Sequence, residues 1–252
     1  MLAFVAITLV LASAAVVSAI VDRSGDTVLG LARFWSRAIM LAAGVKLTIQ
    51  TERPLDAGQP HVFMANHLSA ADIFSLFIAV PFPVRMIAKK SLGRIPFFGW
   101  AMHAGRFIFI DRQNPIAARR SIEEAARRIH NGHSVLLFPE GTRSRDGYLG
   151  PFKKGGFHLA IASGADIIPV GIRGTREVMR PRSLLIYPGS ITVHIGAPIS
   201  TTGMAHDDRD ALLEQVRALI RDMSGQADRP AVADGPDRPA PPASAVNRGS
   251  GQ

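Results

Sequence analysis

Short apolar runs recur along the middle of the chain, and each is bounded by polar or turn residues. Six runs have the length of a strand, and several are unbroken, as expected of strands covered on both faces of a sheet. They span residues 61–65, 84–88, 107–110, 135–138, 167–172 and 191–195. Helical patterns lie between them, so the sequence predicts an α/β fold with a mixed, largely parallel sheet flanked by helices.

The clearest helix is predicted from Pro115 to about His130. Asn114 supplies a capping side chain, Pro115 suits the first helical position, and Asn131-Gly132 ends the segment. Two Glu–Arg pairs spaced four apart, Glu123 with Arg127 and Glu124 with Arg128, would support its exposed face. A shorter helix is expected over residues 73–78 and a last one over about 207–223.

The first 21 residues are apolar and carry no charged side chain, a length sufficient to cross a bilayer as a helix. The segment lacks the positively charged start of a signal peptide, which favours a retained anchor over a cleaved leader. Arg23, Arg33 and Arg37 follow it, and by the positive-inside tendency they place the body on the cytoplasmic side of the cytoplasmic membrane.

A second apolar segment, residues 27–47, carries Arg33 and Arg37 on one helical face. This pattern fits a helix lying in the membrane interface, and equally an ordinary amphipathic helix packed on the domain. We therefore divide the chain into an N-terminal membrane anchor and interfacial helix (1–48), one α/β domain (49–224) and a disordered tail (225–252). The tail is rich in Pro, Ala, Gly and Asp.

Composition narrows the function. The absence of cysteine excludes disulfides, thiolate zinc sites and an acyl-cysteine mechanism. The formal net charge of +9 favours anionic partners such as a membrane surface or phosphorylated small molecules. Aromatic residues make up only 7%, and no basic stripe is interleaved with them, so we expect no nucleic-acid partner.

The stretch from Asn66 to Asp72 (Asn-His-Leu-Ser-Ala-Ala-Asp) is the first candidate for chemistry, because it joins a predicted strand to a predicted helix. A carboxylate that binds one ring nitrogen of His67 would leave the other free to take a proton. The two side chains can meet only if His67 precedes the helix and Asp72 lies in its first turn. In the alternative interpretation, Ser69-x-x-Asp72 is a capping box that satisfies helix amides.

Three further stretches follow predicted strands or open a helix. In Pro139-Glu140-Gly141-Thr142-Arg143-Ser144, glycine allows close backbone approach and Arg143 suits a phosphate, although a polar turn explains the stretch as well. Asp111-Arg112 ends another strand, where a solvated loop is the simpler interpretation. Lys153 and Lys154 open a helix and would suit a second phosphate or be merely solvated. Arg173, flanked by glycines, is a further candidate.

Several familiar sites are absent from the sequence. There is no G-x-S-x-G elbow, no G-x-x-x-x-G-K-[ST] phosphate loop and no H-E-x-x-H helix. The remaining histidines, such as His130, His133 and His194, lack ligand spacing and are interpreted as structural. No metal site is expected.

Taken together, four stretches resemble the motifs of the glycerolipid acyltransferases, most closely the 1-acylglycerol-3-phosphate acyltransferases. Residues 66–72 are similar to the first motif, N-H-x-x-x-x-D, and residues 105–112 resemble the second. Residues 138–144 match the third almost letter for letter, and residues 168–174 resemble the fourth. The resemblance covers roughly residues 60–198, with the motifs in the family's order and spacing.

The resemblance implies an acyltransferase that moves a fatty acyl group to 1-acylglycerol-3-phosphate, giving phosphatidic acid. It implies His67 as general base and Asp72 as its partner. The implied substrate-binding residues are Asn66, Arg112, Glu140, Gly141, Thr142, Arg143 and Lys153. An acyl-CoA or acyl carrier protein thioester would be the co-substrate, with no further cofactor, and membrane lipids would be partners.

Other activities stay open on the sequence. Related enzymes with these motifs esterify glycerol 3-phosphate or other lysolipids. A thioesterase would pass the acyl group to water, and a non-catalytic module would only bind anionic lipid.

Overall fold

The computed structural model describes residues 2–111, 114–181, 183 and 185–229. Within them, seven strands form one sheet in the order β1-β7-β6-β2-β5-β3-β4. The strands are β1 (Val45–Thr51), β2 (His61–Ala65), β3 (Val84–Lys89), β4 (Ile108–Ile110), β5 (Ser134–Leu137), β6 (Asp166–Arg173) and β7 (Gly189–Ile195). Only the β6–β7 pair is antiparallel among these strands, which confirms the predicted mixed, largely parallel sheet.

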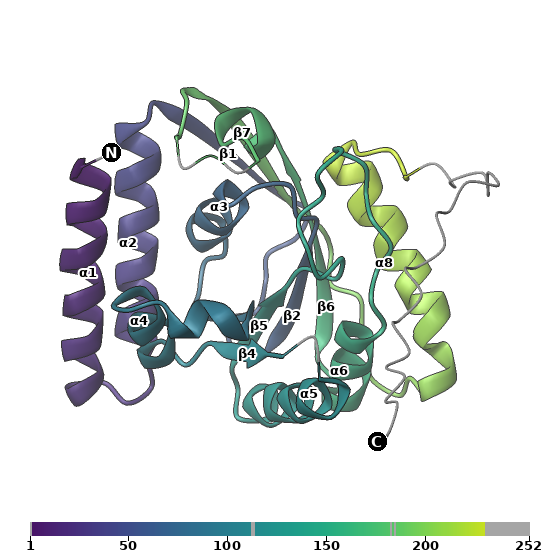
Figure 1. The fold of residues 1–252 in the computed structure, drawn as a ribbon. Coiled ribbons are helices and arrows are strands. Elements are labelled where there is room, and N and C mark those ends of the chain that lie inside the picture. Colours follow the sequence, from purple (N-terminus) through teal and green to yellow (C-terminus); the bar gives the residue numbers. More distant parts are fainter. Residues whose placement is uncertain (1, 112–113, 182, 184, 230–252) are drawn as a thin grey trace, which may run out of the picture.

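Helices cover both faces of the sheet (Figure 1). The α-helices are α1 (Leu2–Val21), α2 (Asp26–Ala42), α3 (Ala71–Ala79), α4 (Phe98–Ala104), α5 (Pro115–His130), α6 (Gly155–Ser163), α7 (Thr175–Val178) and α8 (Arg209–Ser224). Two short 3-10 helices, η1 (Lys90–Arg94) and η2 (His206–Asp208), complete the described elements. In Figure 1, α1 and α2 stand on the same side of the sheet as α3, and α8 stands on the other side.

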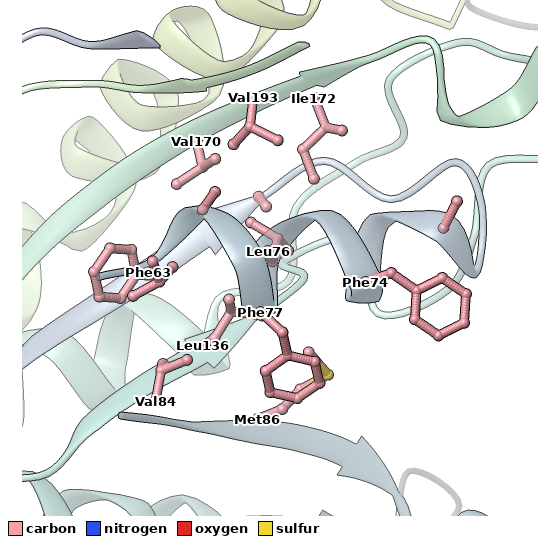
Figure 2. Packing of buried hydrophobic residues seen from close by; sticks show 14 of the residues in the cluster. Phe63, Phe74, Leu76, Phe77, Val84, Met86, Leu136, Val170, Ile172 and Val193 are labelled. Atoms are coloured by element: carbon pink, nitrogen blue, oxygen red, sulfur yellow. The ribbon is translucent and has the colours of Figure 1, made fainter. Parts of the chain in front are cut away.

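Alternate residues of the central strands enter two separate cores. On β2, Phe63 joins the cluster beneath α3, whereas Val62 joins the cluster beneath α5, α6 and α8. Figure 2 shows the first cluster, in which Phe77 of α3 lies above Met86 of β3. Because both faces are buried, these strands tolerate almost no polar residue, which is why they were recognisable as unbroken apolar runs.

All six predicted strands are present, but the structure adds β1. The helix predicted over residues 27–47 ends at Ala42, and Gly44 adopts a φ of +67° that stops it. Residues 45–51 then form β1, which pairs in parallel with β7 over its whole length. The predicted domain boundary at residue 49 is therefore wrong, because the first strand of the domain begins at Val45.

The helix predicted from Pro115 to His130 is confirmed as α5. The Asn114 side chain accepts a hydrogen bond from the Ala117 amide at 3.0 Å, as a capping residue should. The ion pairs differ in part from the prediction. Glu124 binds both Arg127 and Arg128, so Arg127 pairs with Glu124 in place of Glu123.

Two arginines fasten the N-terminal helices to the α/β core. Arg33 of α2 donates hydrogen bonds to the backbone carbonyls of Phe77 and Val80, at the end of α3. Arg85 of β3 is buried and binds the Asp26 carboxylate at 2.6 Å. Helix α2 thus packs on the domain as an amphipathic helix. Over the part of the chain whose side chains are described, no helix is both long and apolar enough to cross a membrane.

The structured part of the chain extends beyond the predicted boundary at Ser224. Gly225 ends α8 with a φ of +66°, and Leu149 and Asp228 form an isolated parallel β-bridge. The prediction of a disordered tail from residue 225 is therefore wrong up to Arg229. Residues 230–252 lie outside the described part of the chain.

Candidate active site

Two neighbouring parallel strands bring the first and third motifs together. Strand β2 ends at Ala65 and its neighbour β5 ends at Leu137, so the residues that follow both strands emerge at the same edge of the sheet. The His67 ring stacks on Phe138 with centroids 3.8 Å apart and an angle of 11° between the planes. A hydrogen bond from the Ser144 amide to the His67 carbonyl, at 2.8 Å, joins the two loops again.

His67 and Asp72 meet as the sequence predicted. The His67 Nδ1 atom lies 2.7 Å from Asp72 Oδ2, because His67 precedes α3 and Asp72 lies in its first turn. A carboxylate at Nδ1 favours the tautomer in which that nitrogen carries the proton. In the described part of the chain Nε2 has no hydrogen-bond partner, so it is available to accept a proton.

Asp72 also binds backbone amides of the turn that precedes α3. Its Oδ2 atom accepts hydrogen bonds from the amides of Leu68 and Ser69, each at 2.8 Å. Ser69 Oγ accepts from the Ala71 amide and donates to the Met179 carbonyl. The capping-box interpretation is wrong, because Ala70 is the N-cap of α3 and no described side chain caps it. The Asp72 oxygen instead orients the imidazole and satisfies the amides of the turn in which the imidazole sits.

Glu140 is buried next to His67 and connects two loops of the site by hydrogen bonds. It is only 6% exposed, and its two carboxylate oxygens accept from the amides of His67 and Gly150, at 2.8 and 2.9 Å. Burial raises the pKa of Glu140, while the two amide hydrogen bonds oppose that rise. The carboxylate thus holds two loops, and the structure does not place it where it could bind the substrate directly.

Asn66 is fully buried and also binds protein groups. Its side-chain amide donates to the Ile172 carbonyl at 3.0 Å and accepts from the Ile172 amide at 2.7 Å. This exchange continues the pairing of β2 with β6 for one more residue. Asn66 Nδ2 also donates to Gln226 Oε1 at 2.6 Å. Asn66 therefore supports the loop that carries His67 and has no surface for a ligand.

Gly141, Thr142, Arg143 and Lys153 lie on the more open side of the site. Gly141 has a φ of +73°, and a Cβ added there would lie 2.9 Å from Lys153 Cε, so the lysine stem occupies the space that a side chain would take. Thr142 and Arg143 are exposed, and Arg143 has no ion-pair partner among the described residues. Arg143 and Lys153 are thus placed to attract an anion.

Two arginine predictions have different outcomes. Arg112 lies outside the described residues. Arg173 does not join the site, because its guanidinium donates to the carbonyls of Met223 and Asp222 at the end of α8.

No group of three or more His, Asp or Glu side chains that could hold a metal ion occurs in the described part of the chain.

An apolar cavity of about 430 Å³ opens beside His67. His67 and Arg143 are among its few polar lining residues. Its apolar walls come from α1, α2, α3, α4, β3 and η1, and include Leu11, Trp35, Phe74 and Met102. The N-terminal helices therefore form part of the site, which motif spacing alone did not reveal.

Sequence reasoning missed two further residues, Phe138 and Gln226. Phe138 is the first residue of the third motif, but a ring stack on His67 has no local signature in the sequence. Gln226 lies far along the chain in a segment with the composition of a tail, and nothing in its neighbourhood marked it.

Comparisons with known proteins agree on a single family. Residues 46–173 match the family model described as Acyltransferase. A 1-acyl-sn-glycerol-3-phosphate acyltransferase from Cocos nucifera is 37% identical over 177 residues, which cover 70% of this chain and 58% of that protein. One from Saccharomyces cerevisiae is 34% identical over 194 residues, covering 76% and 64%. The chain thus spans little more than half the length of the curated relatives it matches.

A similar fold also occurs among solved structures. An example is the crystal structure of the 1-acyl-sn-glycerophosphate (LPA) acyltransferase PlsC from Thermotoga maritima. The TM-score is 0.68 at 24% sequence identity, and the match covers 82% of this chain and 85% of that one.

The role of Glu140 predicts a pH-dependent effect of Glu140→Gln. The substitution turns an NH₂ group toward one of two backbone amides, so we expect the free energy of unfolding to fall by about 1–3 kcal/mol. A raised pKa means that the wild-type carboxyl stabilises the fold most below its ordinary pKa, and that this contribution is lost as pH rises through the folded-state pKa. The destabilisation should therefore be larger near about pH 5 than near about pH 8, a range set by this linkage.

Denaturant unfolding of both proteins across this pH range measures the effect. Glu123→Gln, on the exposed face of α5, is the matched control and should change the free energy of unfolding by less than about 0.5 kcal/mol. Parallel pH profiles for wild type and Glu140→Gln would show that burial does not raise the pKa of Glu140.

Proposed function

The chain belongs to the acyltransferase family, since residues 46–173 match its model over half of the sequence, and we propose that it acylates 1-acylglycerol-3-phosphate to phosphatidic acid. The observation that carries the proposal is the His67–Asp72 pair at the wall of an apolar cavity that Arg143 also lines. A proton acceptor, a cation and an apolar chamber meet there, and these are the three groups that this reaction needs.

In the proposed reaction His67 Nε2 takes the proton from the free hydroxyl of the lysophospholipid as that oxygen attacks the thioester carbonyl. A C–O bond forms, the C–S bond breaks, and the proton passes from His67 to the leaving thiolate. Asp72 orients the imidazole and stabilises its protonated form. No covalent acyl-enzyme is needed, which agrees with the absence of cysteine and of a nucleophile elbow.

The apolar cavity suits the fatty acyl chain of the thioester donor. Its volume of about 430 Å³ lies in the ordinary range for small-molecule sites, and its lining is almost entirely aliphatic and aromatic. Burial of the chain would place the carbonyl carbon beside His67 and exclude water from the reaction. The donor would be an acyl-CoA or an acyl carrier protein thioester.

Arg143 and Lys153 suit the phosphate of the acceptor. Arg143 offers the planar fork that binds phosphate oxygens in pairs, and it is free of carboxylate partners in the described part of the chain. An acceptor without phosphate would leave this guanidinium unused. We therefore place lysophosphatidic acid ahead of neutral acceptors, and glycerol 3-phosphate and other lysolipids as its alternatives.

We also propose that the protein works at the cytoplasmic membrane with its active site facing the cytoplasm. The support is the outer surface of α1, where Val17, Ile20 and Val21 are 63, 78 and 90% exposed. Phe34 and Leu41 of α2 and Trp100 of α4 are also more than half exposed. Membrane lipids would cover this apolar surface, and the positive net charge favours anionic headgroups.

The proposed mechanism predicts the loss of acyl transfer in His67→Ala. With a labelled acyl thioester and lysophosphatidic acid in detergent micelles, wild type should form phosphatidic acid, and His67→Ala should lose about 10²–10⁴-fold in kcat. Asp72→Asn should also lose activity, because the imidazole would no longer be held in the required tautomer. His158→Ala, at an exposed position of α6, is the matched control and should retain full activity.

Three outcomes would contradict this assignment. Equal transfer by wild type and a folded His67→Ala would show that His67 is not the base. Free fatty acid without esterified lipid would identify a thioesterase. Lipid binding without turnover of any of the proposed acceptors would favour a non-catalytic lipid-binding protein.

The cavity predicts a change of donor preference in Ala101→Phe. Ala101 of α4 lines the cavity, and a phenyl ring there would occupy part of the space for the acyl chain. We expect kcat/KM to fall by about tenfold for the longest acyl chain that wild type uses, and to stay within about twofold for the shortest, since a lost or blocked methylene contact has this magnitude. Ala211→Phe, exposed on α8, is the control. An equal loss of kcat/KM for every chain length would show that the acyl chain does not bind in this cavity.

The membrane proposal predicts weaker vesicle binding by Val17→Ser/Val21→Ser. The double substitution removes apolar area that the bilayer would cover, so the partition coefficient onto vesicles containing anionic lipid should fall on the order of tenfold. Leu219→Ser, on the surface of α8, should leave binding unchanged. If the double variant floats with the vesicles as efficiently as wild type, the membrane-binding surface does not include Val17 and Val21.

A further inference from the structure

The segment from Gly225 to Arg229, which we call the C-terminal strap, lies outside the family match and crosses back to the active site. It follows α8 and runs beside the loop that leaves the third motif (Figure 1). The Leu149 amide donates to the Ala227 carbonyl at 2.9 Å, and the Arg229 amide donates to the Leu149 carbonyl at 3.3 Å. The strap therefore adds a short strand-like edge to this loop.

Gln226 of the strap connects the first motif to the third-motif loop. Its side chain is 8% exposed. Oε1 accepts from Asn66 Nδ2 at 2.6 Å, and Nε2 donates to the Gly147 carbonyl at 2.9 Å. The primary amide of Gln226 thus joins Asn66, which lies 160 residues earlier in the chain, to the loop that begins with Arg143.

The strap is itself held in place. Asp228 forms ion pairs with Arg217 and Arg221 of α8, and Arg229 pairs with Asp146 of the loop. Arg173 caps the end of α8 immediately before the strap begins. Because several anchors fix its backbone, Gln226 can serve as a rigid support for the more exposed loop.

The loop is anchored to the site at its two ends. Ser144 is tied to the His67 carbonyl at one end, and Gly150 is tied to Glu140 at the other. Between them it contains a local turn, in which Ser144 Oγ accepts from the Gly147 amide and Asp146 Oδ1 accepts from the Ser144 hydroxyl and the Tyr148 amide. Arg145, Asp146 and Tyr148 are exposed. The strap adds contacts from outside the loop. Gln226 binds the Gly147 carbonyl in the middle of this span, close to the arginine that would hold the phosphate.

We propose that Gln226 is a positioning residue for the phosphorylated acceptor, acting by fixing the loop of Arg143 against Asn66. The identity of the acceptor rests on the proposed function. The claim that Gln226 holds the loop rests on its hydrogen bonds alone. Glutamine suits the position because its side-chain amide supplies an acceptor for Asn66 and a donor for Gly147 on two separate atoms. Loss of either bond leaves a buried polar group unpaired.

Two full-length variants test the inference. Gln226→Met keeps the size of the side chain and removes both hydrogen bonds. Gln226→Glu keeps the acceptor for Asn66 but sets a carboxylate oxygen against the Gly147 carbonyl. Gln215→Met, exposed on α8, is the matched control.

The first measurement is amide hydrogen exchange of peptides that cover residues 141–150, which requires no substrate. In both Gln226 variants the amides of this loop should exchange about tenfold faster. The reason is that the free energy needed to open the loop falls by about the contribution of one hydrogen bond. Peptides from β2 and β5 should exchange as in wild type. Unchanged exchange in the loop overturns the inference.

The second measurement separates positioning from general stability. The KM for lysophosphatidic acid should rise about tenfold in both variants, whereas the KM for the acyl thioester should stay within about twofold, since the cavity is untouched. A proportional loss in every kinetic constant, following the folded fraction, would make the strap merely structural and overturn the inference. If wild type does not acylate lysophosphatidic acid, the proposed function is wrong, and exchange alone then decides whether Gln226 holds the loop.

Discussion

One carboxylate oxygen of Asp72 accepts hydrogen bonds from the His67 ring and from the amides of Leu68 and Ser69. The two amides fix the carboxylate relative to the backbone, and the carboxylate in turn fixes the ring. Because Asp72 is fully buried, none of these bonds competes with water. The imidazole is therefore held in one orientation by the protein itself, which is the condition that the proposed proton transfer requires.

This arrangement depends on the position of α3, the short helix that carries Asp72. Arg33 of α2 binds the carbonyls at the far end of α3, and α3 also supplies Phe74 and Phe77 to the cavity wall. The same helix thus orients the proposed base and shapes the apolar chamber. A displacement of the N-terminal helices would act on both at once, so these helices belong to the site as much as the motifs do.

The sequence predicted the elements whose signals are local. β2 and β6 were recognisable because burial on both faces demands unbroken apolar runs, and α5 because its cap is adjacent to it. Strand β1 was missed because its apolar residues continue the pattern of the preceding helix, and only the φ of Gly44 separates them. Gln226 could not be predicted, since its partners are distant in the chain and one of them is a backbone carbonyl.

The polar residues of the first and third motifs divide into two groups that sequence alone cannot distinguish. His67 and Arg143 line the cavity, whereas Asn66 and Glu140 are buried behind it and bind backbone groups. Burying a carboxylate is costly, and Glu140 offsets that cost by accepting two amide hydrogen bonds that join the loops of both motifs. These two motifs therefore contain residues that support the loops of the site as well as residues that line its cavity, and burial with hydrogen bonds to the backbone places Asn66 and Glu140 in the first group.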